Sequence, residues 1–425
     1  MMAAIIRVMN CLRLLRLLAM ILVVFVVASC ASFDPVPIDK VSFLDRSQTQ
    51  QEGNVVVTAS VLSAEESEQM FGVDLYKKEI QPIWLEIENK DAGPVWFLPV
   101  GLDPEYFTPL EASYHNHFNS RNLNSEMDQH FRSNGMGLYI APDEIRSGFV
   151  FTNLDEGTKN FIVDIFGMDQ QLRTLTFYIA VPGLQADHTT VDFANLYPAD
   201  EIVSYTLEEL QQALAQLPCC TKDRKDKNQG DPLNIAVIGT LDDVFYAFMR
   251  AGWDETETVY HTSLKKTVSS FLFGGKYRYS PVSALYVFER SQDIALQKTR
   301  DNIHERNHLR LWMTNMRFVD QPVWIGQISR DIGVRFTTKT FTTHKIDPDV
   351  DETRAFLLQD LWYAQSLLRY AYVKGVGEAP FDEPRANLTG DPYFTDGLRA
   401  VLWVSSDPVD MEEVDDLSWE NPAQR

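Results

Sequence analysis

The sequence predicts an N-terminal all-β domain of immunoglobulin-like sandwich type, followed by an α+β domain that combines a mixed sheet with helices. Seven short segments rich in β-branched and aromatic residues, separated by Gly, Pro, Asn and Asp, occur between residues 54 and 181. After residue 231 a strand pattern is followed at once by a helix pattern. The 425 residues, 45% of them hydrophobic, also exceed the ~100–200 typical of one domain.

The first 29 residues have the pattern of an export signal. Arg7, Arg13 and Arg16 form a positive segment, Leu17 to Val27 form an apolar segment, and small residues precede Cys30. We therefore expect residues 1–29 to be a signal peptide.

Residues 27–30, Val-Ala-Ser-Cys, resemble the lipobox of bacterial lipoproteins, in which cleavage precedes the cysteine and the cysteine carries the lipid. The alternative is an uncleaved anchor, because Ile5 to Val27 approaches the ~20 apolar residues of a membrane span. The resemblance implies lipidation at Cys30 and attachment to the cell envelope. Ala31, at the second mature position, is similar to lipoproteins of the outer membrane, facing the periplasm.

The net charge of −22 argues against nucleic acid and anionic lipid surfaces as electrostatic partners. Residues 406–425 are expected to form a solvated acidic tail. Cys219 and Cys220 remain after removal of Cys11 and lipidation of Cys30. We expect a vicinal disulfide or two loosely buried thiols with a structural role rather than a redox centre, because no Cys-x-x-Cys spacing is present.

The first domain is expected to span residues 54–217, after a lipid-anchored tether at 30–53. In one segment Ile83, Leu85 and Ile87 alternate with polar residues and should face the core. The seven expected strands are Val55 to Leu62, Gln81 to Glu88, Val95 to Val100, Gly137 to Ala141, Phe149 to Thr152, Asn160 to Ile165 and Arg173 to Val181.

Three of the eight histidines, His115, His117 and His130, lie in the polar segment Phe107 to Arg132. His115 and His117 could face one metal ion from an extended segment. The absence of cysteines and of a close acidic partner favours a solvated loop.

Thr206 begins a capping box and a helix that should close the first domain, and the charged residues 218–231 should form the linker. The second domain is expected at residues 232–405. It opens with a strand at Asn234 to Gly239 and a helix capped by Thr240. Its later elements are expected to be strands at Ala284 to Phe288, His308 to Met313, Val323 to Ser329, Val334 to Thr343 and Leu398 to Val404, and a long helix from Asp351 to Val373.

Titratable residues are concentrated between His304 and Arg354. His308, Arg310 and Trp312 alternate with apolar residues, so a strand would place all three on one face. We expect the neighbouring strand ends and the start of the following helix to complete a concave site there. The candidate catalytic residues are His308, His344, Asp331 and Asp347, and the candidate ligand-binding residues are Arg310, Arg330, Trp312 and Trp324.

Two metal-binding patterns occur in this stretch. His304 and His308 match H-E-x-x-H, but the strand-like alternation that starts at His308 opposes the helix that this zinc motif requires. Asp347, Asp349 and Asp351 match the start of a calcium loop, but Glu352 stands where the loop needs glycine. Neither pattern identifies a cofactor.

Nine ordered motifs cover about half of the chain and together resemble the LssY-like C-terminal domain, which often accompanies membrane modules. They are Asp231-Pro-Leu-Asn-Ile, Gly252-Trp253, Tyr279-Ser-Pro281, Gln297-Lys298, His308-Leu-Arg-Leu-Trp312, Trp324-Ile-Gly326, Ser329-Arg-Asp-Ile-Gly333, His344-Lys-Ile-Asp-Pro-Asp-Val-Asp351 and Tyr393-Phe-Thr-Asp-Gly-Leu-Arg399.

Two functional hypotheses follow. In the first, the domain is a binding or scaffolding module of the cell envelope in which His308, Arg310 and Arg330 recognise an anionic lipid headgroup or another phosphate-containing ligand. In the second, it is a phosphoester or lipid-headgroup hydrolase, with a histidine as general acid or base and Asp331 or Asp347 orienting it or holding a metal.

Overall fold

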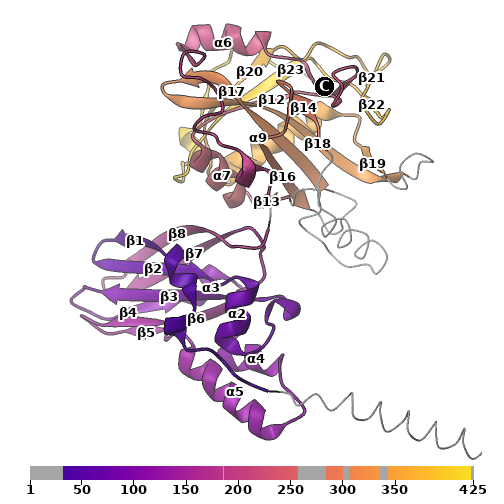
Figure 1. Ribbon diagram of the computed structural model, residues 1–425. Helices are drawn as coiled ribbons and strands as arrows, with labels where there is room; N and C mark the ends of the chain where they lie inside the picture. The colour runs from indigo at the N-terminus through magenta and orange to yellow at the C-terminus, as the bar shows by residue number, and fades with distance from the viewer. Residues whose placement is uncertain (1–31, 185, 257–283, 300–305, 336–342, 423–425) are drawn as a thin grey trace, which may run out of the picture. The chain divides into compact units, whose positions relative to one another are not determined.

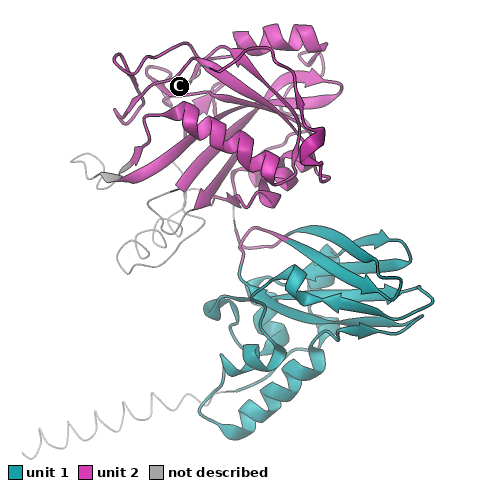
Figure 2. Cartoon of the chain, turned by 180° about the vertical axis from the view of Figure 1, so that it is seen from behind, with its two compact units in different colours: residues 1–154, 161–179 teal, residues 155–160, 180–425 magenta. Residues whose placement is uncertain are grey.

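The computed structural model describes residues 32–184, 186–256, 284–299, 306–335 and 343–422. The chain forms two compact units, both rich in β-sheet (Figures 1 and 2). The first extends to Leu154 and includes Phe161–Ile179, and the second contains Asp155–Asn160 and continues from Ala180. Among the described residues, no helix combines the length and the apolar character needed to cross a membrane.

The first unit contains two four-stranded sheets, ordered β1-β2-β3-β6 and β5-β4-β7-β8. The seven strands expected from the sequence correspond to β2 through β8. The strands are β1 (Gln48–Glu52), β2 (Val55–Val61), β3 (Ile80–Asn89), β4 (Val95–Leu98), β5 (Tyr139–Ile140), β6 (Ile145–Asn153), β7 (Thr158–Gly167) and β8 (Leu172–Ala180). The first sheet is antiparallel throughout.

The core of the first unit follows the expected alternation, since Ile83, Leu85 and Ile87 of β3 are all fully buried. Short helices pack against this sheet, and they include Met127 and Phe131, which lie one helical turn apart. The helices are α2 (Ala64–Phe71), α3 (Pro99–Leu102), α4 (Pro109–Tyr114) and α5 (Arg121–Asn134).

Two expectations about the first unit need correction. Residues 107–132 were expected to form a solvated loop but contain α4 and α5, because buried side chains every fourth position stabilise a helix. Residues 30–53 were expected to be a tether. Phe43 is instead fully buried and accepts a hydrogen bond from Ser60 at 2.6 Å, and β1 pairs with β2.

The second unit contains a large mixed sheet with the order β13-β16-β17-β18-β12-β23-β20-β24, to which β9 and β19 are attached at β17 and β18. β12 pairs with β23 in parallel and with β18 antiparallel, and all four of its residues are buried, as expected for a central strand. The strands are β9 (Val203–Tyr205), β12 (Ile235–Ile238), β13 (Asp254–Glu255), β16 (Ile294–Thr299), β17 (Arg306–Phe318), β18 (Gln321–Arg335), β19 (Thr343–Ile346), β20 (Leu367–Lys374), β23 (Leu398–Val404) and β24 (Asp415–Asp416).

The helices in the described part of this unit are α6 (Leu207–Gln216), α7 (Leu241–Arg250) and α9 (Val350–Tyr363). Thr206 forms the expected capping box of α6, and Thr240, the expected cap of α7, also forms a capping box. α6 packs on the sheet face that carries Ala236, and α9 packs on the opposite face of β18 (Figure 1). We call the second of these the α9 face.

Residues 218–231, expected to be a linker, lie inside the second unit, as does α6. They contain β10 (Cys220–Lys222) and most of β11 (Gln229–Pro232). These two strands form a small sheet with β14 (Tyr286–Val287) and β15 (Arg290–Ser291). Thr221 and Asp231 are buried despite the charged composition of the segment. Cys219 and Cys220 form a vicinal disulfide.

The C-terminal elements also differ from expectation. The helix ends at Tyr363 rather than Val373, because Gln365 adopts a left-handed conformation with φ of 56° and the β-branched and aromatic residues that follow form β20. Most of the strand expected at 334–343 lies outside the described residues; β18 continues to Arg335 and β19 begins at Thr343. Within the expected acidic tail, β24 pairs with β20 and Trp419 contacts Trp403.

Candidate functional site

The candidate site lies on one face of the three neighbouring strands β16, β17 and β18. Residues that pair across adjacent strands point to the same face. His308 of β17 pairs with Ser329 of β18 and with Gln297 of β16. Arg310 pairs in the same way with Gln327. We call this surface the histidine face, and it is the side of the sheet opposite the α9 face.

Six polar side chains gather on the histidine face, and we call them the polar cluster. Each is at least nine-tenths buried, and His308 and Arg310 retain 6% and 8% of their surface, so the edge of the cluster reaches solvent. The members of the polar cluster are Gln297, Arg306, His308, Arg310, Gln327 and Asp331.

His308 and Asp331 form the centre of the polar cluster. His308 Nε2 lies 2.7 Å from Asp331 Oδ2, and Arg306 Nε lies 3.8 Å from the same oxygen. Burial lowers the pKa of His308 to about 4, although the Asp331 charge opposes this shift. The imidazole is therefore neutral at pH 7. Because a carboxylate only accepts hydrogen bonds, Nε2 carries the proton and donates a hydrogen bond to Asp331.

The two arginines of the cluster each donate a hydrogen bond to a glutamine. Arg306 Nη1 donates to Gln297 Oε1 and Arg310 Nη1 donates to Gln327 Oε1, both at 2.8 Å. Burial lowers the pKa of both guanidinium groups, because it penalises their charged form. A guanidinium group has no acceptor, so these contacts fix which end of each amide is the oxygen.

Gln327 consequently presents an amide donor on the histidine face. Its side chain is fully buried, and its Nε2 has no hydrogen-bond partner in the described part of the chain. A buried donor without an acceptor costs about 1–3 kcal/mol. Buried polar groups almost always have a hydrogen-bond partner, and an acceptor atom of a bound ligand would supply one for Gln327 Nε2.

Two aspartates from outside the three strands face Arg310. Electrostatic attraction links Arg310 to Asp231 of β11 and to Asp187. Burial raises the pKa of both carboxyl groups, and the Arg310 charge opposes this rise. Asn387 Nδ2 donates to Asp231 Oδ1 at 3.1 Å. The small sheet thus supplies an acidic side chain beside the cationic part of the cluster.

Arg330 does not join the cluster. It pairs with Asn307, so it lies on the α9 face, where its Nε donates to Asn307 Oδ1 at 3.1 Å. Its guanidinium group lies 5.1 Å from the centre of the Phe356 ring of α9. The expectation that Arg330 and Asp331 act together is therefore corrected, because adjacent residues of a strand point to opposite faces.

Trp312 and Trp324 are core residues rather than ligand-binding residues. Both are fully buried, and they lie on opposite faces, since Trp312 pairs with Ile325 and Trp324 with Met313. The indole groups donate to main-chain oxygens, Trp312 to Arg290 at 3.3 Å and Trp324 to Gly239 at 3.0 Å. Their polar atoms are therefore already used within the fold.

His344 and Asp347 lie beyond the polar cluster. His344 pairs with Val334 in the β18–β19 ladder, and its side chain is outside the described side chains. Asp347 Oδ1 accepts a hydrogen bond from the Asp349 amide at 3.0 Å, just before α9. Asp347 is therefore placed as a turn residue that leads into the helix.

Sequence reasoning missed three members of the polar cluster, Gln297, Arg306 and Gln327. The alternation that selected His308 and Arg310 extends back to Arg306, and β18 repeats it at Gln327, Ser329 and Asp331. That signal was present, but only the register of the pairing connects the two strands.

The metal motifs are not supported. His308 lies in a strand, whereas the zinc motif needs a helix, and His304 lies outside the described residues. Among the described residues, no group of three or more His, Cys, Asp or Glu side chains could hold a metal ion.

The second unit is therefore a domain with a mixed sheet, helices on both faces of that sheet and a buried polar cluster. Residues 212–398 match the family model described as LssY C-terminus. The chain therefore contains an LssY-like C-terminal domain. One of its nine motifs, at 279–281, lies outside the described residues. No curated protein matches the chain.

Proposed function

We propose that the LssY-like domain is a binding module that recognises a phosphate-containing anionic ligand at the polar cluster. The observation that carries this proposal is the fully buried Gln327 Nε2 group, held beside Arg310, for which the described residues offer no acceptor. Phosphate offers several acceptor oxygens, and arginine and amide donors suit it well. A ligand oxygen at this position would satisfy the donor and offset part of the cost of burying it.

The composition of the cluster also supports a ligand role. Burying two guanidinium groups and an imidazole on one face is unfavourable, and well-packed apolar residues commonly serve the fold as well or better. Groups with pKa values shifted by burial are frequent at functional sites. The proposal concerns Arg306, Arg310 and Gln327 and no longer includes Arg330.

A matched pair of variants tests the proposal. In the full chain purified in detergent, Arg310→Gln should weaken calorimetric binding of inorganic phosphate at least roughly tenfold, because a charged donor is removed. Arg330→Gln is the control, since it removes a guanidinium group from the same strand pair on the α9 face. Binding of glycerol phosphate in parallel distinguishes a lipid headgroup from the free anion. Failure of both anions to bind, or equal losses in both variants, would refute the proposal.

A hydrolase is the second candidate, and one specific arrangement favours it. The His308–Asp331 pair has the form of an imidazole oriented by a carboxylate, and Ser329 pairs with His308 on the same face. If this candidate is right, the chain should turn over p-nitrophenyl phosphate, and His308→Gln should abolish turnover. Binding without turnover would leave the binding module as the function.

We further propose that the chain is an envelope lipoprotein anchored through Cys30 to the outer membrane, on its periplasmic side, with an immunoglobulin-like sandwich as its first unit. The lipobox-like residues 27–30 support the anchor, although they lie outside the described residues. The two four-stranded sheets of the first unit support the sandwich. Cys30→Ser should release the chain from the membrane fraction, and unchanged fractionation with an unchanged mature mass would contradict lipidation.

A further inference from the structure

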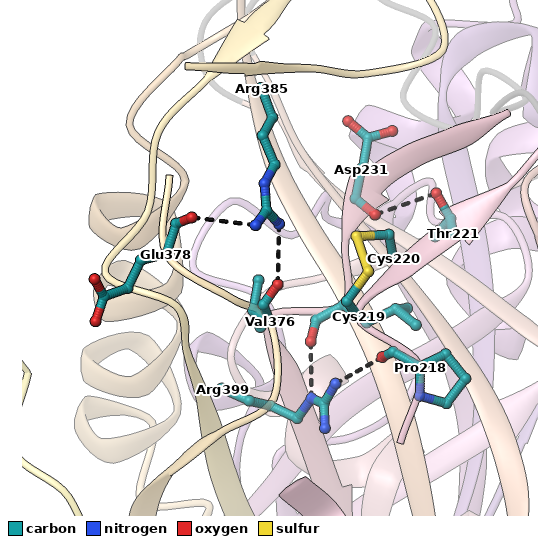
Figure 3. Close-up of a disulfide and its surroundings, with 10 residues drawn as sticks. Pro218, Cys219, Cys220, Thr221, Asp231, Val376, Glu378, Arg385 and Arg399 are labelled. Atoms are coloured by element: carbon teal, nitrogen blue, oxygen red, sulfur yellow. Dashed lines mark hydrogen bonds between the residues drawn. A yellow bond between two sulfur atoms is a disulfide. The ribbon is translucent and has the colours of Figure 1, made fainter. Parts of the chain in front are cut away.

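The two cysteines of the vicinal disulfide line different cavities of the second unit. Cys219 lines a cavity of about 920 Å³ together with Gln229 and Arg385. Cys220 lines a second cavity, of about 730 Å³, together with Lys225. Figure 3 shows the two sulfur atoms between the Arg385 segment and the strand that carries Asp231. Both volumes fall within the ~300–1,000 Å³ of small-molecule sites.

The two sulfur-bearing residues differ in access. Cys219 is half-buried, whereas Cys220 is 3% exposed. Thiol–disulfide exchange requires a thiolate to reach one of the two sulfur atoms, so access selects the sulfur that is attacked. A thiol in the larger cavity would meet Cys219.

The backbone around the disulfide is held by other contacts. Arg399 is fully buried and donates to the Leu233 carbonyl oxygen at 2.8 Å. It also donates to the Pro218 carbonyl oxygen at 2.8 Å (Figure 3). The Leu233 amide donates to the Cys219 carbonyl oxygen at 2.8 Å. A bond between neighbours also closes almost no loop, so it contributes the least chain-entropy stabilisation of any disulfide. The fold therefore does not depend on this bond to fix the path of the chain.

We propose that Cys219–Cys220 is a thiol–disulfide exchange site for small thiol compounds that enter the larger cavity. A thiolate attacks Cys219 Sγ, a new sulfur–sulfur bond forms, the bond to Cys220 breaks, and Cys220 leaves as a thiolate that takes a proton from water. A second thiol then attacks the mixed disulfide, releasing the oxidised compound and the Cys219 thiol. In sum, two small thiols are oxidised to one disulfide and the protein disulfide is reduced to two thiols.

The test treats the folded full chain with glutathione, stops the reaction by alkylation and locates the adducts by peptide mass spectrometry. The mixed disulfide should appear on Cys219. Gln229→Trp, an exposed position in the larger cavity, should slow its formation roughly tenfold by obstructing approach to the sulfur. Lys225→Trp is the control, because this exposed position lines the second cavity and should leave the rate unchanged.

Three results would overturn the proposal. They are an adduct on Cys220, reduction that occurs only after denaturation, and a Gln229→Trp rate equal to that of the unaltered chain. Each of these readouts is independent of phosphate binding, so the exchange site and the binding module can fail separately.

Discussion

The two faces of the β17–β18 strand pair carry similar residue types in different arrangements. On the α9 face, polar side chains connect the sheet to its surroundings: Lys298 Nζ lies 2.6 Å from Asp360 of α9, and Arg330 lies over Phe356. On the histidine face, His308 and Arg310 bond to side chains of the neighbouring strand. The first arrangement attaches a helix. The second joins side chains of neighbouring strands and holds a set of donors in place, which is why we assign ligand binding to it.

The largest expected effect is a loss of stability, and it tests whether the polar contacts of α9 serve the fold alone. Arg354 of α9 is buried and donates two hydrogen bonds to Asp396, at 2.8 and 2.9 Å. Arg354→Met should lower the free energy of unfolding by about 3–5 kcal/mol, because it leaves the buried Asp351 carboxylate and the partly buried Asp396 carboxylate without their cationic partner. Urea unfolding measures this loss, and phosphate binding by the folded variant should not change.

The double variant Arg354→Met with Asp396→Leu should recover part of that stability, because the Asp396 charge is removed together with its partner. Asp351, 3.3 Å from Arg354, stays charged and keeps its hydrogen bonds from Thr395 and the residue-396 amide. If Arg354→Met lowers the free energy of unfolding by less than about 1 kcal/mol, or if it loses phosphate binding, the two faces do not differ in role as we propose.

The next effect concerns pH and the histidine face. The folded-state pKa of His308 is about 4, below its ordinary value of 6.5, so between these values the unfolded chain binds a proton that the folded chain does not. Stability should therefore be complete above pH 6.5 and fall by roughly 3 kcal/mol as the pH drops to 4. His188, whose pKa burial also lowers to about 4, adds a loss of the same sign.

Replacing His308 with Gln should remove about half of the pH dependence of stability that His308 and His188 together cause. Urea unfolding midpoints between pH 7 and pH 4.5 measure this change. His188→Gln is the matched control and should remove a similar share without affecting phosphate binding. An unchanged pH slope in His308→Gln would show that the imidazole is charged in the folded protein.

A smaller effect separates binding from stability within the polar cluster. Gln327→Glu converts the amide donor into an acceptor and gives Arg310 a carboxylate partner. Phosphate affinity should fall roughly tenfold, while the free energy of unfolding should stay equal or rise by about 1 kcal/mol. Calorimetry and urea unfolding of the same preparation measure the two quantities. Loss of both together would identify Gln327 as a structural residue.

The smallest effect concerns a residue that the sequence nominated for catalysis. Asp347→Asn keeps the oxygen that accepts the Asp349 amide. We therefore expect a stability change within about 1 kcal/mol and no change in phosphate binding or turnover. A loss of turnover in this variant would return Asp347 to the site.

Local patterns predicted much of the fold. The capping boxes at Thr206 and Thr240 marked helix starts, and β23 spans the residues expected, Leu398–Val404. Composition gave a wrong prediction where tertiary contacts determine the structure. Residues 218–231 are charged and were expected to be a linker, yet they form strands and bury Thr221 and Asp231. A charged segment can be a buried element when its charges have partners, and the sequence does not display those partners.

The candidate site was predicted in part. His308, Arg310 and Asp331 come together as expected, because alternation places His308 and Arg310 on one face. Arg330 could have been excluded from the sequence alone, since it adjoins Asp331 in a strand. Gln327 could not have been singled out, because its importance comes from a cross-strand contact that fixes the direction of its amide.

Arg399 has a consequence for the order in which the second unit can form during synthesis. It binds the carbonyl oxygens of Leu233, Leu214 and Pro218, which precede it by 166, 185 and 181 residues. β23, which contains Arg399, also supplies the parallel partner of β12. Contacts between such distant residues form slowly. A growing chain therefore cannot complete this unit until nearly all of it has left the ribosome, and earlier segments depend on a residue that is made late.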